Sequence, residues 1–181
     1  MEIGKTLYLT SRKGWRAWLE SNYDKETEIW LVYYRKDSGK PRIPYDEAVE
    51  EALCFGWIDS IEKGVDSERF AQRFSPRKPK STWSEMNKER VRRLIKQGKM
   101  TSAGLTLFPK DENPFKIPAD ILKELKEDKE TWENFQKFPE SYQRIRVGWI
   151  DMSRSRPDEF KKRLNYFLKK TRQNEKFGMV Q

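Results

Sequence analysis

The sequence contains no histidine and only one cysteine, Cys54. Without histidine the chain cannot use Ser-His or Cys-His nucleophile activation, and it lacks the commonest ligand of transition metals. A single cysteine can form neither an intramolecular disulfide nor a CxxC redox or zinc motif. These absences favour a reducing compartment. We expect no metal site and no cofactor, and any enzyme built on this chain would have to use carboxylates, Lys, Tyr or a cofactor.

Long apolar runs are absent as well. No stretch approaches the roughly 20 residues that a membrane-spanning helix needs, and the first residues lack the apolar segment of a signal peptide. We therefore expect a cytoplasmic protein without a membrane span. The chain is polar, with 37% charged residues, but 13% aromatic residues, including seven Trp, supply enough burial for a folded core.

Positive charge is abundant and unevenly distributed within a net charge of +9. Eleven Lys or Arg residues between positions 69 and 99 stand against two acids, and eleven between 142 and 176 stand against four. An acid-rich stretch precedes both, at 44–68, where eight acids stand against one lysine. Basic surfaces of this kind attract phosphates and other anions, although a well-charged solvated surface explains the same distribution.

The pattern of apolar residues predicts an α+β fold. Residues 28–36 are rich in β-branched and aromatic side chains, which is typical of a strand, and 57–63 and 68–74 predict a hairpin joined by a turn at 64–67. Pro44 opens a predicted helix with apolar positions at helical spacing, and Ser84 is the predicted N-cap of another that ends at Gly98. We expect a small antiparallel sheet covered by helices.

Three consecutive regions follow from this pattern. An α+β domain with a mixed or antiparallel sheet should occupy residues 1–108, and a Pro-rich linker should occupy 109–118. Residues 119–181 should form an all-helical region. We expect that region to pack on the first domain through one stripe of apolar side chains, which comprises Phe160, Leu164, Phe167 and Leu168.

The segment 73–84 is the most unusual in the sequence. It combines prolines with four cations and leads into the helix that Ser84 is expected to cap. Free N–H groups at a helix N-terminus and bidentate arginine contacts both favour phosphate, sulfate or carboxylate. In the alternative, Arg73 and Arg77 pair inside the fold with acids of the preceding segment, of which the candidates are Asp59, Glu62 and Glu47.

Other candidate residues surround this segment. Asp59 is the best single carboxylate for a general base or a cation contact, but no second carboxylate lies at a diagnostic spacing. Asn87 should be partly buried, where holding the Pro-rich loop is favoured over a ligand contact. Cys54 falls on a helix flank with acids, opposite the apolar stripe, which disfavours a thiolate. We predict no catalytic residue and one concave ligand site, lined by Trp57, Asp59, Arg73, Arg77, Lys78, Trp83, Ser84 and Asn87.

Several segments resemble one known family. These are 51–59 (EALCFGWID), 73–78 (RFSPRK), 81–87 (STWSEMN), 98–100 (GKM) and 141–151 (SYQRIRVGWID) followed by 154–168. Together they are similar to the YdeI/OmpD-associated family. The run at 152–157 departs from the family pattern, which weakens any role for its arginines. The resemblance implies a bacterial protein linked with bacteriocin protection or antimicrobial-peptide resistance, without an established enzymatic activity.

We therefore expect a non-catalytic protein that binds an anionic ligand, with an indirect link to stress or peptide resistance. The ligand would be a phosphate-containing small molecule or nucleic acid, and the sequence identifies no protein partner. Aromatic and basic residues alternate at 30–35 and around Trp83, as they do in nucleic-acid-binding surfaces, although packing explains them as well. A nucleic-acid-associated protein is thus the first alternative, and an enzyme acting on a phosphorylated or acidic small molecule is the second.

Overall fold

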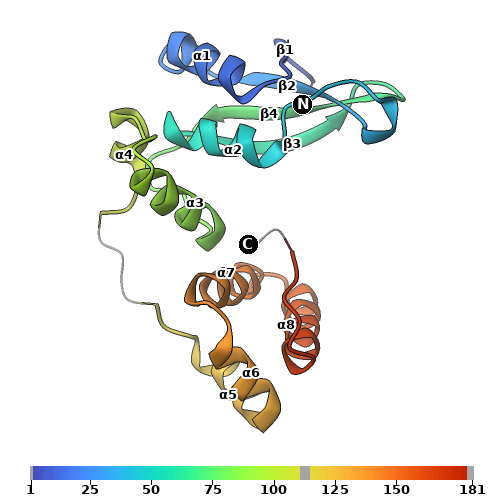
Figure 1. The fold of residues 1–181 in the computed structure, drawn as a ribbon, viewed down its shortest axis with the longest axis vertical. Coiled ribbons are helices and arrows are strands. Elements are labelled where there is room, and N and C mark those ends of the chain that lie inside the picture. Colours follow the sequence, from blue (N-terminus) through green and yellow to red (C-terminus); the bar gives the residue numbers. More distant parts are fainter. Residues whose placement is uncertain (1, 111–114, 179–181) are drawn as a thin grey trace. The chain divides into compact units, whose positions relative to one another are not determined.

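The computed structural model describes residues 2–110 and 115–178, which form two compact units. The first unit comprises Met1–Thr82 and Arg90–Pro109, and the second comprises Trp83–Glu89 and Lys110–Gln181. The boundary between them falls inside the helix Glu85–Lys96, whose first turn belongs to the second unit. Figure 1 labels the helices and strands along the chain. The α+β class is confirmed.

A four-stranded sheet is the centre of the first unit, with the strand order β1-β2-β4-β3. Strand β2 pairs in parallel with β1 and antiparallel with β4, and β3 pairs antiparallel with β4. The sheet is therefore mixed, and of the two expected arrangements, mixed or antiparallel, the structure has the mixed one. The elements of this part of the chain are β1 (Thr6–Tyr8), α1 (Arg12–Asn22), β2 (Ile29–Tyr34), η1 (Lys36–Ser38), α2 (Tyr45–Cys54), β3 (Trp57–Gly64), β4 (Arg69–Pro76), α3 (Glu85–Lys96) and α4 (Ser102–Leu107).

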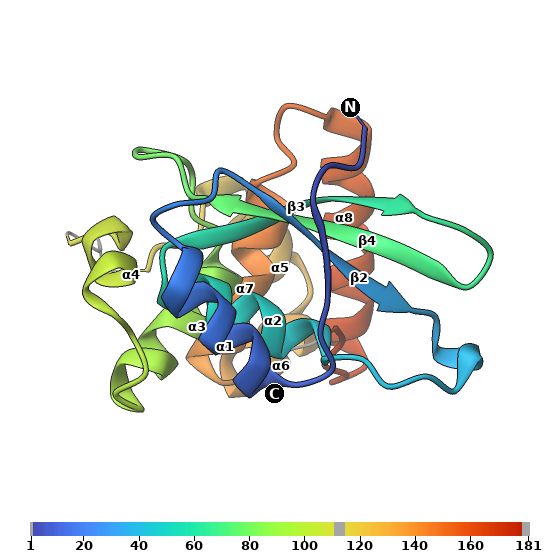
Figure 2. The same ribbon diagram turned by 90° about the horizontal axis from the view of Figure 1, so that it is seen from above.

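Aromatic side chains join the sheet to the helices that cover it. Trp15 on α1 is fully buried, contacts Phe74 of β4 edge to face at 5.4 Å, and donates its indole N–H to the Ala48 carbonyl of α2. Helices α1 and α2 therefore lie side by side over the same part of the sheet (Figure 2). On the opposite face, Trp30 and Val32 form a smaller buried cluster with Ala71. Both faces of β2 are buried, which explains its continuous apolar sequence.

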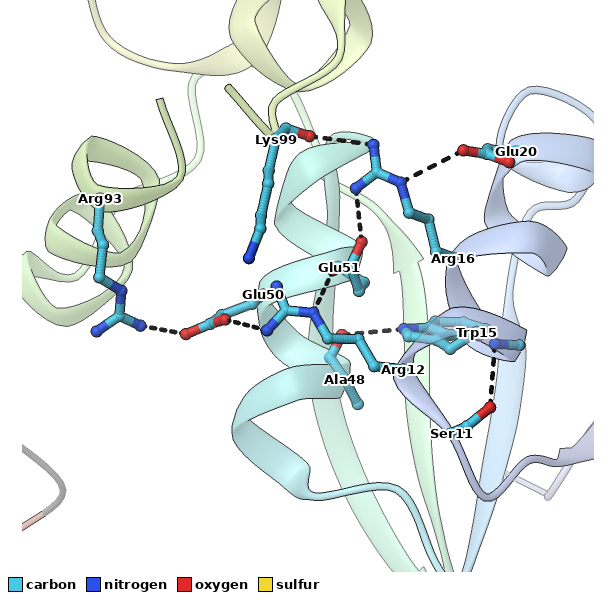
Figure 3. A network of polar contacts seen from close by, with 11 residues as sticks. Ser11, Arg12, Trp15, Arg16, Glu20, Ala48, Glu50, Glu51, Arg93 and Lys99 are labelled. Atoms are coloured by element: carbon cyan, nitrogen blue, oxygen red, sulfur yellow. Dashed lines mark hydrogen bonds and ion pairs between the residues drawn. The ribbon is translucent and has the colours of Figure 1, made fainter. Parts of the chain in front are cut away.

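Buried ion pairs tie α2 to its neighbours (Figure 3). Glu51 is 2% exposed and accepts hydrogen bonds from Arg12 and Arg16 of α1, the latter at 2.8 Å. Glu50 is 8% exposed and accepts from Arg12 at 2.9 Å and from Arg93 of α3. Burial opposes the charge of Arg12, but the carboxylates outweigh it and raise the pKa of Arg12 above its ordinary value. The expected solvent-facing flank of α2 is thus an interior surface.

Helix α4 was not predicted, and it closes the C-terminal end of α2. The Thr101 hydroxyl donates to the Cys54 carbonyl at 2.6 Å and accepts from the Gly104 N–H, which caps α4. Gly104 is buried so close to α2 that a Cβ atom there would lie 2.3 Å from the Cys54 carbonyl oxygen. The short apolar sequence of α4 therefore depends on contact with α2 for its position.

The second unit is helical apart from its connections, as expected. Its helices are α5 (Ala119–Glu127), α6 (Lys129–Lys137), α7 (Glu140–Asp151) and α8 (Pro157–Arg172). The predicted stripe on α8 lies within the core of this unit, where Leu164 and Phe167 are buried and Phe160 and Leu168 pack at its edge. Packing of this region on the α+β domain stays a prediction. Residues 111–114 of the predicted linker lie outside the described residues.

Local sequence signals account for the ends of these helices. The Asp128 carboxylate accepts from the Thr131 N–H at 2.8 Å and begins α6, and Pro157 occupies the first turn of α8 as predicted. The Asn134 amide donates to the carbonyls of Thr171 and Arg172 at the end of α8. None of the described helices combines the length and the apolarity that crossing a membrane requires.

The buried carboxylate of Glu51 should dominate the stability of the first unit. We expect Glu51→Gln to lower the free energy of unfolding by about 2 to 4 kcal/mol, because the guanidinium groups of Arg12 and Arg16 then lose the negative charge of Glu51 in a poorly hydrated site. Glu20→Gln is the matched control, since the Glu20 carboxylate pairs with the same Arg16 at 3.3 Å but is exposed. That variant should lose about 0.5 kcal/mol or less in the same urea titration. Equal losses would contradict this account of the network.

Close packing of α4 on α2 gives a second stability test. Gly104→Ala should destabilise the protein by about 1 to 3 kcal/mol, because the added methyl group meets backbone carbonyls that cannot rotate away. Gly64→Ala is the control, since a Cβ atom there meets nothing within 4 Å. Thermal unfolding should therefore separate the two variants, and an unchanged midpoint for Gly104→Ala would show that α4 can shift.

Candidate functional site

The predicted site residues of the first unit have structural partners. Trp57 is buried at the start of β3, where its indole N–H donates to the Tyr23 carbonyl at 3.0 Å. Asp59 accepts a 2.5 Å hydrogen bond from the Tyr45 hydroxyl. Burial and this carboxylate both raise the pKa of Tyr45. The charge of Asp59 also acts on the guanidinium of Arg77, so these two predicted residues are electrostatic neighbours.

The arginines of the Pro-rich segment are held inside the fold. Arg73 pairs with Glu28 at 2.7 Å and donates to Ser60 and Ser75. Arg77 is 7% exposed and donates to the Thr82 carbonyl at 2.5 Å, and burial lowers its pKa. Internal pairing of Arg73 was anticipated as an alternative, but its partner is Glu28 rather than Asp59, Glu62 or Glu47, because β2 and β4 are neighbours in the sheet.

The predicted site residues fall into both compact units. Lys78 is exposed in the first unit. Trp83, Ser84 and Asn87 belong to the second unit, whereas Arg73, Arg77 and Lys78 belong to the first. The Ser84 hydroxyl accepts from the Asn87 N–H at 3.2 Å and so caps α3 as predicted. Asn87 is partly buried, as expected. Convergence of all eight residues on one site stays a prediction.

A cavity of about 360 Å³ in the second unit includes the N-terminus of α3. Of the predicted residues it contains Ser84, and it adds residues of α7, α8 and the loop between them. The complete lining consists of Ser84, Glu85, Met86, Ile145, Arg146, Trp149, Met152, Arg156 and Arg163.

Arg146 is the unusual member of this lining. Its side chain is 6% exposed, and its Nε and Nη2 atoms make no hydrogen bond among the described residues. Three aromatic rings frame its guanidinium at 4.4 Å (Phe177), 5.4 Å (Tyr142) and 6.0 Å (Trp149). Burial lowers the pKa of Arg146, but an arginine remains charged in proteins. The cavity therefore contains a buried positive charge that aromatic faces stabilise only in part.

The other charged groups of the cavity are mostly compensated. Arg163 pairs with Glu159 at 2.7 Å and donates to the Trp149 carbonyl at 2.7 Å. Glu85 pairs with Lys88 at 2.6 Å. Arg156 is exposed, and its charge contributes to lowering the pKa of Glu159, whose largest cause is the hydrogen bond from Arg163. The cavity thus keeps an excess of positive charge next to a helix N-terminus, which also favours anions.

Sequence reasoning missed Arg146, although a signal was present. The apolar stripe of α7 includes Tyr142, Ile145 and Trp149, and Arg146 lies four residues after the first and three before the last. Positions with this spacing share one helix face. The spacing therefore predicts that Arg146 lies on the apolar face of α7 and is buried there. No such sequence signal predicts that Arg163 and Met86 line the cavity, because they reach it only through the packing of α8 and the first turn of α3.

A second cavity, of about 390 Å³, lies between α5, α6 and α8. Glu124, Glu127 and Asp128 line it together with Lys169 and Arg172. Arg172 interacts with Asp128 at 3.9 Å and with Glu130 at 3.5 Å. This cavity has no clear excess of either charge. Within residues 2–110 and 115–178 no group of three acids or cysteines has the arrangement of a metal site.

The structure thus defines an α+β protein with a helical unit that contains a cationic cavity. Residues 7–107 match the model of a family described as a domain of unknown function (DUF8412). That match covers more than half of the 181 residues, and the chain belongs to this family. Comparison with curated proteins and with solved structures gave no significant match.

A second family model matches the C-terminal region. Residues 114–174 match the family described as bacteriocin-protection, YdeI or OmpD-associated, which confirms the resemblance found in the sequence. The motifs between 51 and 100 that contributed to that resemblance lie instead within the first match. Arg146, Trp149, Arg156 and Arg163 all lie within the second.

Cys54 is the remaining reactive group, and it is fully buried near the end of α2. Burial raises the pKa of the Cys54 thiol to about 11, and the charge of Glu51 adds to the effect. The thiol is therefore almost entirely protonated at neutral pH, as the sequence predicted, although the residue lies in the interior rather than on an outer flank.

Cys54 should react with thiol reagents only after unfolding. At pH 8 in native buffer we expect labelling by a maleimide or by a disulfide reagent to be slower by more than about a hundredfold than in 6 M guanidinium, because only the exposed thiolate reacts. Mass spectrometry of timed samples measures both rates. Rapid labelling of the folded protein would show that the thiol is accessible.

Proposed function

We propose that this protein binds a small anion in the cavity formed by the N-terminus of α3 with α7 and α8. The observation that carries the proposal is the buried guanidinium of Arg146, whose Nε and Nη2 atoms lack hydrogen-bond partners among the described residues. A buried charge without a counter-charge is strongly unfavourable, and an anion in the adjacent cavity would supply the counter-charge.

The surroundings of Arg146 support a ligand site rather than a defect of packing. Aromatic rings hold the guanidinium in one orientation, which lowers the entropy lost when an anion binds. The first turn of α3 is part of the lining through Ser84 and Met86. Because α3 has 12 residues, its N-terminus adds a partial positive charge at the cavity. A carboxylate or phosphate group in the cavity would then be attracted by the guanidinium charge and by the helix end.

Binding is better supported than catalysis. Glu85, the carboxylate of the lining, pairs with Lys88. The buried thiol and the Tyr45 hydroxyl belong to the other unit and have raised pKa values, which makes them poor nucleophiles and poor bases at neutral pH. An enzyme acting on a phosphorylated or acidic small molecule is the less supported alternative.

Nucleic acid is the competing anionic partner, and exposed cations on α8 favour it. Lys161, Lys162 and Lys169 are exposed on this helix. A duplex backbone could contact these lysines but could not reach a guanidinium that is 6% exposed. The two modes differ in salt dependence, since the slope of log affinity against log salt grows with each phosphate that a protein neutralises.

The proposed role in peptide or bacteriocin resistance is indirect. A net charge of +9 repels cationic peptides, so direct capture of such peptides is unfavourable. An anion-binding protein could instead respond to a phosphorylated or acidic metabolite during stress. The single cysteine, a buried thiol, favours a reducing compartment such as the cytoplasm.

Loss of the Arg146 charge should remove anion binding without unfolding the protein. We expect Arg146→Gln to lower the affinity for inorganic phosphate by at least about tenfold, measured by calorimetry at low salt, because the positive charge beside the anion is lost. The unfolding midpoint without ligand should stay the same or rise, since the variant no longer buries an uncompensated charge.

Arg144→Gln is the matched control for this experiment. Arg144 lies on the same helix but pairs with Glu140 at 2.6 Å and does not line the cavity. Its replacement should leave phosphate affinity unchanged. A wild-type protein that binds neither phosphate nor sulfate, or an Arg146 variant that loses stability but keeps its affinity, would refute the proposal. A steep salt dependence with DNA and none with phosphate would favour the nucleic-acid alternative.

A further inference from the structure

We infer that the ligand of this cavity is an organic phosphate monoester with an apolar, planar group, rather than a free inorganic anion. The inference rests on the proposed function and adds the class of ligand. It depends on three properties of the same cavity: the size of its charge excess, the chemical nature of its walls and the depth at which the charge lies.

The charge excess fits a dianion. Arg146, Arg156 and Arg163 line the cavity, and Glu85 is the acid of the lining. Three positive groups against one negative group give the lining an excess of two positive charges. A phosphate monoester carries about −1.5 to −2 at pH 7, whereas a carboxylate or a sulfonate carries only −1. The excess therefore favours phosphate over a monoanion.

The walls fit an organic group. Ile145 is 4% exposed, and Met86, Trp149 and Met152 complete an apolar side of the lining. A volume of about 360 Å³ falls in the range of roughly 300 to 1,000 Å³ that organic ligands occupy in proteins. An inorganic phosphate at Arg146 would leave this apolar side in contact with water, whereas an attached planar group would cover it. Methionine side chains also adapt well to aromatic rings.

The order of the groups along the cavity gives the ligand a direction. Arg146 lies at its buried part, whereas Met152 is 53% exposed and Arg156 is exposed. The phosphate would therefore lie deep, against the guanidinium and the first turn of α3. The organic group would extend along Trp149 and the two methionines toward the solvent-exposed end of the cavity, where Arg156 lies.

Four probes test this inference on the full chain by calorimetry at pH 7.5 and low salt. They are phenyl phosphate, inorganic phosphate, benzenesulfonate and benzyl alcohol. Phenyl phosphate should bind at least about tenfold more tightly than inorganic phosphate, because covering the ring and the apolar wall contributes more than about 1.4 kcal/mol. It should also bind at least about tenfold more tightly than benzenesulfonate, which has the same ring but one charge fewer. Benzyl alcohol should not bind.

Two variants separate the apolar contribution from the charge. Met86→Ala combined with Met152→Ala should lower the affinity for phenyl phosphate by about threefold to tenfold and leave inorganic phosphate unchanged, because only the ring loses contacts. Arg146→Gln should weaken both ligands by the same factor. Lowering the pH from 7.5 to 5.5 should weaken phenyl phosphate but not benzenesulfonate, since the second phosphate ionisation has a pKa near about 6.

The outcomes distinguish this inference from the proposed function. Equal affinities for phenyl phosphate and inorganic phosphate would overturn the organic group while leaving anion binding intact. Equal affinities for phenyl phosphate and benzenesulfonate would overturn the dianion. No binding of any of the three anions would refute the inference and the proposed function together.

Discussion

Buried carboxylates on α2 hold the first unit together. Glu50 and Glu51 are adjacent in sequence, and together they receive guanidinium groups from α1 on one side and from α3 on the other. Three helices thereby share one electrostatic centre above an aromatic core. Such a centre stabilises only when every member is present, because removing one partner leaves a buried charge without compensation. Two acids of the acid-rich stretch thus lie in the interior, and the positions of α1, α2 and the second half of α3 depend on them.

The cost of burying a charge also applies to Arg146 in the second unit. Arg146 is as deeply buried as Glu50, but its charge has aromatic neighbours in place of a carboxylate. A fold that pairs Arg12, Arg16, Arg73, Arg154 and Arg163 with acids could have paired this one too. Its position beside a cavity with apolar walls is the basis of the proposed ligand site. Arg146 thereby differs from the paired arginines of the described residues, including Arg163 in the same cavity.

Two regions with different family matches are joined in this chain. The buried ion pairs of α2 lie in the first region, and Arg146 lies in the second. The first match covers the sheet and the carboxylate centre, and the second covers the helices that carry Arg146, Arg156 and Arg163. Helix α3 contributes to both, since its C-terminal half contains Arg93 and its first turn lines the cavity. The distinctive basic segment around Arg77, which drew attention in the sequence, stabilises the first unit, and the proposed ligand site lies elsewhere.

The sequence by itself determined the elements whose signals are local. The β2 strand, the β3–β4 hairpin, the Ser84 cap and the Pro157 start of α8 all follow from neighbouring residues. Only the tertiary structure decided the parallel pairing of β1, the burial of Glu50 and Glu51, the partner of Arg73 and the cavity around Arg146. Each of these features depends on residues that are distant along the chain. Met86 and Arg163, for example, meet only at the cavity. Charge and periodicity indicate which side chains a helix presents, but not which other helix receives them.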